Sequence, residues 1–359
     1  MRKKKNPEKQ KDSPVSNKQR LFMVMFVLLA ALSIFAVAAQ SREFSLADFG
    51  EYIQNASVPW LIVAGICMLG FIFFEAFALM VLCRARNRKP TLWQGFIYSA
   101  SDVYFSAITP SATGGQPASA YFMMKDGFNS MLSTAILIAN LCMYTLAIVI
   151  VGCICLIFRF DIFLQYSLLS QILIIGGFLI QVALLLFFIM VLKKEQLLHK
   201  ICTAVLRFLC KLRLVKNRER KQRRLDGYME RYRRNTRLIT EHPKAMALCL
   251  LFNFLQRASQ IAVTMFVYIA TTGKGIAESL DLLFWQSYVV LGANVIPVPG
   301  AVGVSDYMML DGFGKIMSES QAVNLELLSR SLSFYSCVII CGISIVIQYC
   351  VLKKRGKRE

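Results

Sequence analysis

Two short stretches of this chain combine proline, glycine and small polar side chains in a pattern that suits the binding of an anion. The first runs from Thr109 to Lys125 and reads TPSATGGQPASAYFMMK, and the second runs from Pro297 to Met309 and reads PVPGAVGVSDYMM. Proline removes a main-chain donor and glycine weakens helical order, so neither stretch can be an ordinary spanning helix. Main-chain N–H groups freed beside glycine at the start of a helix form a pocket that suits a phosphate.

The first stretch is predicted to join two half-helices. Pro110 is expected to end one of them and Pro117 to lie early in the next, because proline is tolerated in a first helical turn. Small neutral donors and acceptors lie around these prolines. The candidate binding residues of this stretch are Thr109, Pro110, Ser111, Thr113, Gly114, Gly115, Gln116 and Pro117.

The second stretch places a serine and an acid after its glycines. Ser305 is predicted as an N-cap with Asp306 in the first turn of a new helix, which is a common structural role of this pair. In the alternative interpretation, Asp306 faces a cationic group, either on a substrate or on Arg257. The candidate residues of this stretch are Pro299, Gly300, Gly303, Ser305 and Asp306.

Four further ionisable residues lie within or next to apolar runs, namely Glu75, Asp102, Arg257 and Arg330. A charge at the centre of a bilayer costs roughly 2.5–3.5 kcal/mol even on a lenient insertion scale, so we expect these side chains to point inward and pair. They either pair with one another for structural reasons or line the path of a charged headgroup. Glu75, Arg257 and Arg330 are therefore further candidate site residues.

The elements that position these residues are expected to be membrane helices. The chain has 359 residues, of which 56% are hydrophobic, and its mean hydropathy is +0.53. Soluble domains average about 45–50% apolar residues, so the composition predicts an all-α polytopic membrane protein. The formal net charge of +20 would suggest a nucleic-acid partner in a soluble protein. Here the basic residues lie at the ends and between apolar runs, as the positive-inside rule predicts.

Six apolar runs have the length of about 20 residues or more that a bilayer crossing needs. They are Leu21–Ala39, Val58–Cys83, Met131–Phe158, Leu164–Leu192, Ala245–Ala270 and Leu325–Val351. All basic loops fall on one side only if each broken stretch enters and leaves the membrane by the same face. We therefore expect about six full spans plus two re-entrant broken hairpins, within 91–130 and 280–324, that enter from opposite sides as an inverted repeat.

The chain is predicted to divide at its basic segments, with both termini in the cytoplasm. The predicted parts are a basic cytoplasmic tail (1–20), a first membrane half (21–192, with its break near 109–117), a basic cytoplasmic loop (193–244), a second membrane half (245–352, with its break near 297–306) and a basic cytoplasmic tail (353–359). The first apolar run is interpreted as an uncleaved helix, the alternative being a signal peptide cleaved near residue 38.

Within the basic loop, residues 211–237 mix arginine and lysine with apolar side chains at irregular helical spacing. This pattern predicts a basic amphipathic helix on an anionic lipid surface. RNA is the alternative partner, since arginine with interleaved tyrosine can contact phosphates and bases. No cofactor or metal is expected, because the eleven cysteines lack a paired metal spacing and no nucleotide-binding loop has the proper context.

Three features resemble the transmembrane region of lysylphosphatidylglycerol synthase and its stand-alone flippase-like relatives. They are the TPSATGGQP run ending in Ala120-Tyr121, the PVPGAVGVSD run, and Arg330 followed by Tyr335. The resemblance covers residues 20–352. It implies a bacterial cytoplasmic-membrane protein that handles aminoacylated phospholipid, translocates it and helps to repel cationic antimicrobial peptides.

By position, the resemblance places the binding site on the two broken stretches and on Arg330. The acid of the second motif is often glutamate in similar proteins and is Asp306 here, which has a shorter reach. The implied partner is a membrane phospholipid, either phosphatidylglycerol or its lysyl ester. A second copy of the chain is a further candidate partner, which the resemblance does not decide.

The resemblance leaves enzymatic activity open. Full-length synthases carry a soluble C-terminal domain that transfers lysine from lysyl-tRNA to phosphatidylglycerol, and the 359 residues contain no such domain. Phosphatidylglycerol lysyltransferase activity would therefore need a separate aminoacyl-tRNA-dependent transferase as partner. A membrane scaffold whose breaks are purely structural is the remaining alternative.

Overall fold

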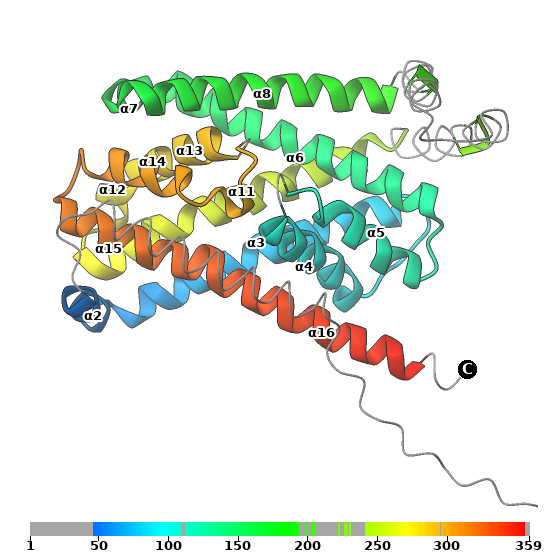
Figure 1. Ribbon diagram of the computed structural model, residues 1–359, viewed down its shortest axis with the longest axis horizontal. Helices are drawn as coiled ribbons and strands as arrows, with labels where there is room; N and C mark the ends of the chain where they lie inside the picture. Colours follow the sequence, from blue (N-terminus) through cyan, green and yellow to red (C-terminus); the bar gives the residue numbers. More distant parts are fainter. Residues whose placement is uncertain are drawn as a thin grey trace, which may run out of the picture.

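The computed structural model describes residues 46–109, 112–193, 241–294 and 296–355, together with a few positions between 199 and 230. The elements in these ranges are all helical (Figure 1). The first apolar run, the amphipathic-helix prediction for 211–237 and both Pro110 and Ser111 lie wholly or largely outside the described residues.

Among the described residues, five helical runs have the length and composition that a membrane crossing requires. They are α3 (Val58–Arg84), α6 (Ser130–Phe158), α8 (Leu168–Lys193), α11 (Pro243–Thr272) and the continuous run Glu319–Leu352. Each matches one of the six predicted runs, with ends that differ by a few residues. The match follows from long stretches of Leu, Ile, Val and Phe in which a helix satisfies every main-chain polar group internally. The all-α polytopic architecture is confirmed.

The last long run changes its winding part-way along. It consists of α15 (Glu319–Arg330), the π-helical turn η3 (Ser331–Ser336) and α16 (Cys337–Arg355). Wider turns of this kind inside α-helices frequently occur at functional sites. Here the π turn begins directly after Arg330, so it sets the position of that side chain relative to α16.

Each predicted break forms a helical hairpin. The first consists of α4 (Leu92–Ile108) and α5 (Gly115–Lys125), and the second of α13 (Asp281–Ala293), the turn η2 (Pro299–Ala301) and α14 (Val304–Phe313). These helices have 10 to 17 residues, which at a rise of about 1.5 Å per residue is shorter than a hydrocarbon core of about 30 Å. None of the four can be a full crossing, as expected for broken segments.

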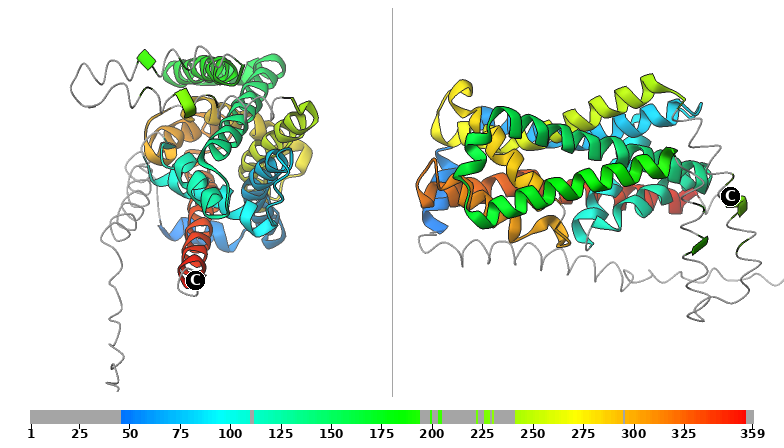
Figure 2. Two further views of the ribbon diagram at one scale, coloured as in Figure 1. Left: turned by 90° about the vertical axis from the view of Figure 1, so that its right-hand side faces the viewer. Right: turned by 90° about the horizontal axis from the view of Figure 1, so that it is seen from above.

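The two hairpins lie at opposite ends of the bundle. In Figure 1 the long helices run roughly horizontally, with α4 and α5 towards the end where α16 finishes and α13 and α14 towards the end where α7 (Phe160–Gln165) lies. The view from above agrees with this placement (Figure 2, right). α3 and α11, which precede the two hairpins, pack against each other. This arrangement is the one expected of an inverted repeat.

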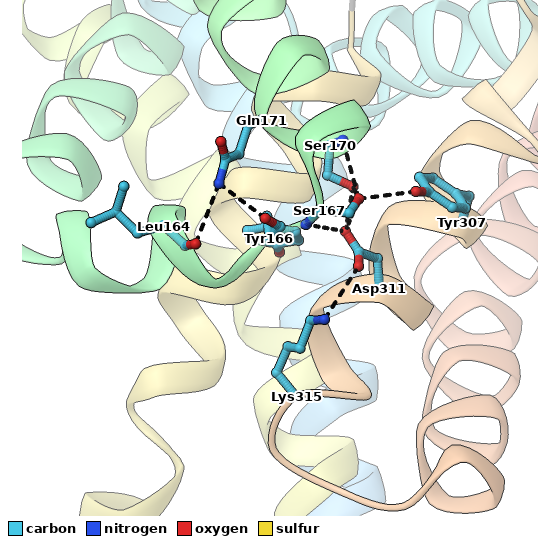
Figure 3. A network of polar contacts seen from close by, with 8 residues as sticks. All are labelled: Leu164, Tyr166, Ser167, Ser170, Gln171, Tyr307, Asp311 and Lys315. Atoms are coloured by element: carbon cyan, nitrogen blue, oxygen red, sulfur yellow. Dashed lines mark hydrogen bonds and ion pairs between the residues drawn. The ribbon is translucent and has the colours of Figure 1, made fainter.

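α8 lies on the outside of the bundle. Only 22% of an apolar 18-residue stretch of α8 is buried, against 50% of the corresponding stretch of α3. Its first residues are nonetheless fixed to the second hairpin through Asp311 of α14 (Figure 3). The Asp311 carboxylate accepts hydrogen bonds from the Ser167 amide at 3.0 Å, the Ser167 hydroxyl at 2.7 Å and the Ser170 hydroxyl at 2.6 Å. A carboxylate at a helix N-terminus is favourable, so this network anchors α8 at one end.

Candidate functional site

The first break is closed by hydrogen bonds within the protein. Thr109 follows α4 in an extended conformation, and its Oγ1 accepts a hydrogen bond from the Gly114 amide at 2.9 Å. The chain passes through Ala112, whose φ of 52° lies in the left-handed region, before α5 begins at Gly115. Pro117 lies in the first turn of α5, as predicted. One of the predicted anion donors, the Gly114 amide, is therefore engaged inside the protein.

Gly115 allows α4 and α5 to cross closely. A Cβ atom at this position would lie 2.6 Å from the main-chain oxygen of Asp102 and would also collide with the side chains of Asp102 and Ser106. Glycine is the residue that permits such an approach of two main chains. Gly115 therefore has a packing role in the hairpin in addition to the predicted role as an anion donor.

Two carboxyl groups, one buried (Glu75) and one partly buried (Asp102), lie behind the first break, and we call them the first acid pair. The pair consists of Glu75 on α3 and Asp102 on α4, whose carboxyl groups contact each other. Gln116 Nε2 donates to Asp102 Oδ2 at 2.9 Å, and Gln256 Nε2 of α11 donates to Glu75 Oε2 at 3.1 Å. The expectation that Glu75 and Asp102 point inward is met, and Gln116 connects them to the first break.

The second break differs from the prediction at its helix start. α14 has Gly303 as its N-cap, with a φ of 84°, whereas the sequence predicted Ser305 in that role. The Gly303 amide donates to Asp306 Oδ2 at 2.8 Å, so Asp306 lies in the first turn as expected. The Ser305 hydroxyl donates instead to the carbonyl of Ala301 at 2.9 Å. Gly303 can turn the chain two residues before Ser305, and Asp306, three residues after Gly303, supplies the capping acceptor.

Arg330 of α15 joins the second break. Its Nε lies 2.9 Å from Asp306 Oδ1, and its Nη1 donates to Ser305 Oγ at 2.6 Å. Glu326, one turn earlier on α15, places Oε1 3.7 Å from Arg330 Nε. The guanidinium also lies over the ring of Phe334, 5.3 Å from its centroid. We call Asp306 and Glu326 the second acid pair, and these two residues with Ser305 and Arg330 the Arg330 cluster.

Arg257, proposed from the sequence as a partner of Asp306, lies elsewhere. Its guanidinium donates to the Tyr144 hydroxyl and to a glutamine one turn later on α11, and lies 4.9 Å from the Tyr144 ring centroid. Asp306 pairs with Arg330, so the alternative in which Asp306 faces Arg257 is wrong. Tyr144 interacts electrostatically with both members of the first acid pair. Arg257 therefore lies near the first acid pair, through Tyr144, and not at the second break.

The two breaks meet inside the bundle. The η2 turn of the second hairpin packs against α4 of the first. Gly300 of that turn, at φ 62°, faces the Phe334 ring, whose Cε2 would lie 2.9 Å from an added Cβ. Ala301 has a φ of 51°, which repeats the left-handed alanine at position 112 of the first break. Of the predicted residues, Gly115, Ser305, Asp306 and Arg330 are buried, whereas Thr113 and Pro117 are exposed. The half-buried ones are Thr109, Gly114, Gln116, Gly300 and Gly303.

Sequence reasoning missed Glu326, Tyr144 and Gln256. Tyr144 and Gln256 lie in apolar helices where nothing in the pattern distinguishes them from structural residues. Glu326 was missed because it lies in the polar beginning of α15, ESQAVNLELLSR. Its signal was the spacing of one helical turn from Arg330, which places the two side chains on the same face.

A family model described as lysylphosphatidylglycerol synthase TM region matches residues 23–341. The chain belongs to this family. The match includes both hairpins, both acid pairs and Arg330, so the site described above lies entirely within the family region. Membership, together with five helical runs of spanning length, establishes a multi-pass membrane protein. A comparison with curated proteins finds no match.

Proposed function

We propose that the protein translocates a phospholipid across the membrane and that its substrate is an aminoacylated phosphatidylglycerol. The observation that carries the proposal is the meeting of two opposed broken hairpins, each with a charged interior cluster. Discontinuous helices at corresponding places in two halves are the usual site of substrate binding in transporters built from inverted repeats. The family description supports the choice of an aminoacylated lipid.

Arg330 is the proposed contact for the lipid phosphate. Its Nη2 atom has no hydrogen-bond partner among the described residues, although the side chain is only 8% exposed. Leaving a buried donor unsatisfied costs about 1–3 kcal/mol, and more for a charged group. A phosphate oxygen would satisfy it, and the planar guanidinium suits phosphate geometry. The remaining amides of the first break would add neutral donors.

The carboxyl groups are the proposed contacts for a cationic headgroup. The two acid pairs supply four carboxyl groups, whereas the interior guanidinium groups described are those of Arg257 and Arg330. The two acid pairs therefore hold more carboxyl groups than there are guanidinium groups beside them, which favours an amino-bearing substrate over a plain anionic lipid. Asp306 is already paired with Arg330, so a substrate amine would compete with that guanidinium for it.

The lipid tails would stay in the bilayer beside the outer helices. α8 and α16 expose large apolar side chains along their lengths, which fits contact with hydrocarbon. On α8 these are Leu168, Leu169, Ile172, Ile175, Leu179, Ile180, Leu184, Leu186 and Phe187, and on α16 they are Ile339, Ile343, Val346, Ile347, Tyr349 and Val351.

The deciding experiment expresses the chain in a bacterium that lacks aminoacylated lipid. Total and outer-leaflet lysylphosphatidylglycerol are measured with and without a separately supplied soluble transferase domain. If the lipid forms only with the supplied domain and reaches the outer leaflet only with this chain, the proposal stands. Lipid that is present but equally distributed without the chain would refute it and leave the scaffold interpretation.

Variants of the first break sharpen this experiment. Gly115→Val should abolish outer-leaflet exposure, since the added side chain collides with Asp102 and forces α5 away from α4. Gly176→Val is the matched control, because a Cβ on this α8 glycine meets nothing within 4 Å. Gln116→Met removes the hydrogen bond to Asp102 without adding bulk, and it should reduce exposure while leaving the amount of inserted protein unchanged. Normal transport by Gly115→Val would contradict the proposed role of the hairpin.

The second candidate function is a membrane component of lysylphosphatidylglycerol synthesis. The family description, which names a synthase, is the observation that favours it. In this case the chain would raise the total amount of the lipid made by the supplied transferase and would leave its distribution between leaflets unchanged. The same experiment therefore separates the two functions.

A further inference from the structure

Glu326 is a buried acid without a hydrogen-bond donor. Its side chain is fully buried, and neither carboxyl oxygen accepts a hydrogen bond from an N–H or hydroxyl donor among the described residues. Its ion-pair contact with Arg330 is long, at 3.7 Å, and the same Arg330 Nε is held by Asp306 at 2.9 Å. An ionised carboxylate in such a place would lose its hydration and gain little in return, which the neutral acid avoids.

The facing group on the other helix is also a carboxyl. Glu326 of α15 lies in hydrogen-bonding contact with Asp306 of α14. Two carboxylates cannot hydrogen-bond unless one of them carries a proton, because both are acceptors. A proton on Glu326 makes it a donor to Asp306, and the cluster of one acid, one carboxylate and one guanidinium is then electrically neutral.

Among the described residues, no charged group besides Asp306 and Arg330 is found to act on Glu326. α11 packs against α15, but its Arg257 points to Tyr144. The short helix α2 (Leu46–Gln54) also contacts α15, and its described acid Glu51 is exposed, while the sequence of η3, SLSFYS, carries no charged residue.

We propose that Glu326 is a proton-binding site which shares its proton with Asp306, and that exchange of this proton drives the lipid movement through the second break. The proposal rests on the proposed translocation and adds its source of energy. When a lipid phosphate binds Arg330, it displaces the Asp306 carboxylate from the guanidinium. The freed Asp306 shares the Glu326 proton more strongly or takes a second one, and it is Asp306 that caps α14 through the Gly303 amide. Protonation thus acts on the start of a half-helix.

The proton site is tested first without transport. The purified full chain is titrated from about pH 5 to about pH 9, and the infrared C=O stretch of protonated carboxyl groups is followed in H2O and D2O. We expect a protonated buried carboxyl near neutral pH that Glu326→Gln removes and Glu319→Gln retains. Glu319 is the matched control, since it lies exposed in the first turn of the same helix. Any band of the first acid pair remains in both variants, so the difference isolates Glu326.

Coupling is tested in vesicles that contain the full chain and lysylphosphatidylglycerol, with outer-leaflet lysyl amines labelled by an impermeant reagent. For one proton per lipid, a gradient of one pH unit should shift the ratio of lipid between leaflets by about tenfold. The unmodified protein and Glu319→Gln should show this shift. Glu326→Gln, which has the shape of the protonated acid and should fold, is expected to give a ratio that does not respond to the gradient.

The infrared titration and the vesicle assay together distinguish the proton-binding proposal from the proposed translocation. Lipid that moves without any response to the gradient overturns the coupling and leaves the proposed function intact, and a full response in Glu326→Gln does the same. A spectrum of the unmodified protein in which no band is assigned to Glu326 overturns the proton site. If no lipid moves in any vesicle, the proposed function fails, and the infrared titration alone then decides for or against proton binding.

Discussion

The pairing of Arg330 with the second break can be tested by a double-mutant cycle. Arg330→Gln leaves two buried carboxyl groups without their cation, while the Gly303 amide and the Ser305 hydroxyl still donate to Asp306. Breaking a buried ion pair by removing one partner typically costs about 3–5 kcal/mol. Asp306→Asn should cost less, about 1–3 kcal/mol, since Glu326 remains within 3.7 Å of the guanidinium.

The interaction appears in the double variant. If Asp306 and Arg330 act as a pair, the combined loss should fall short of the sum of the single losses by about 0.5–3 kcal/mol. The free energy of unfolding is measured in mixed micelles with increasing denaturing detergent. Arg159→Gln serves as the control, because this arginine has the same type of contact, to Asp161 and Asp281, at an exposed site. Single losses that add within about 0.5 kcal/mol would refute the pairing.

Two further predictions concern the left-handed alanines of the breaks and the ion pair between Arg159 and Asp161. Replacing Ala112 or Ala301 by glycine should stabilise the protein by about 1 kcal/mol each, because left-handed alanine is strained, and melting temperatures that fall would contradict the assigned conformation. Hydrogen bonds from Arg159 hold the pKa of Asp161 below its usual range, so the ion pair stabilises the fold above about pH 3.9 and loses that effect as the pH falls further. The melting-temperature difference between the unmodified protein and Asp161→Asn should therefore disappear under strongly acidic conditions, and a difference that persists there would exclude this origin.

The sequence was sufficient to locate the long membrane helices and the two broken stretches. Uninterrupted apolar runs allow one regular structure in a bilayer, so α3, α6, α8, α11 and the last run could be predicted with their approximate ends. Proline and glycine marked both hairpins for the same reason, because they interrupt that structure. Positions along one chain segment follow from local chemistry, and these predictions needed no knowledge of the packing.

The partners of the charged residues could not be predicted in the same way. Both Arg257 and Arg330 were available to Asp306, and only the packing of α14 against α15 decides for Arg330. The contact of Glu326 with Asp306 depends on the same packing. The N-cap of α14 shows that local predictions can also fail. Serine is a good N-cap, yet Gly303 takes this position because glycine can adopt a positive φ.

The left-handed alanines give each break a preferred direction of change. Glycine would visit both signs of φ with similar ease, but alanine holds the left-handed form only while its surroundings enforce it. At Ala301 the surroundings are the Phe334 ring packed on Gly300 and the hydrogen bond that the Ala301 carbonyl accepts from Ser305. An event that loosens either contact lets a single residue return to the right-handed form and swings the half-helix behind it. A change of φ at this one residue would therefore reorient α14 without unwinding the helices on either side of the break.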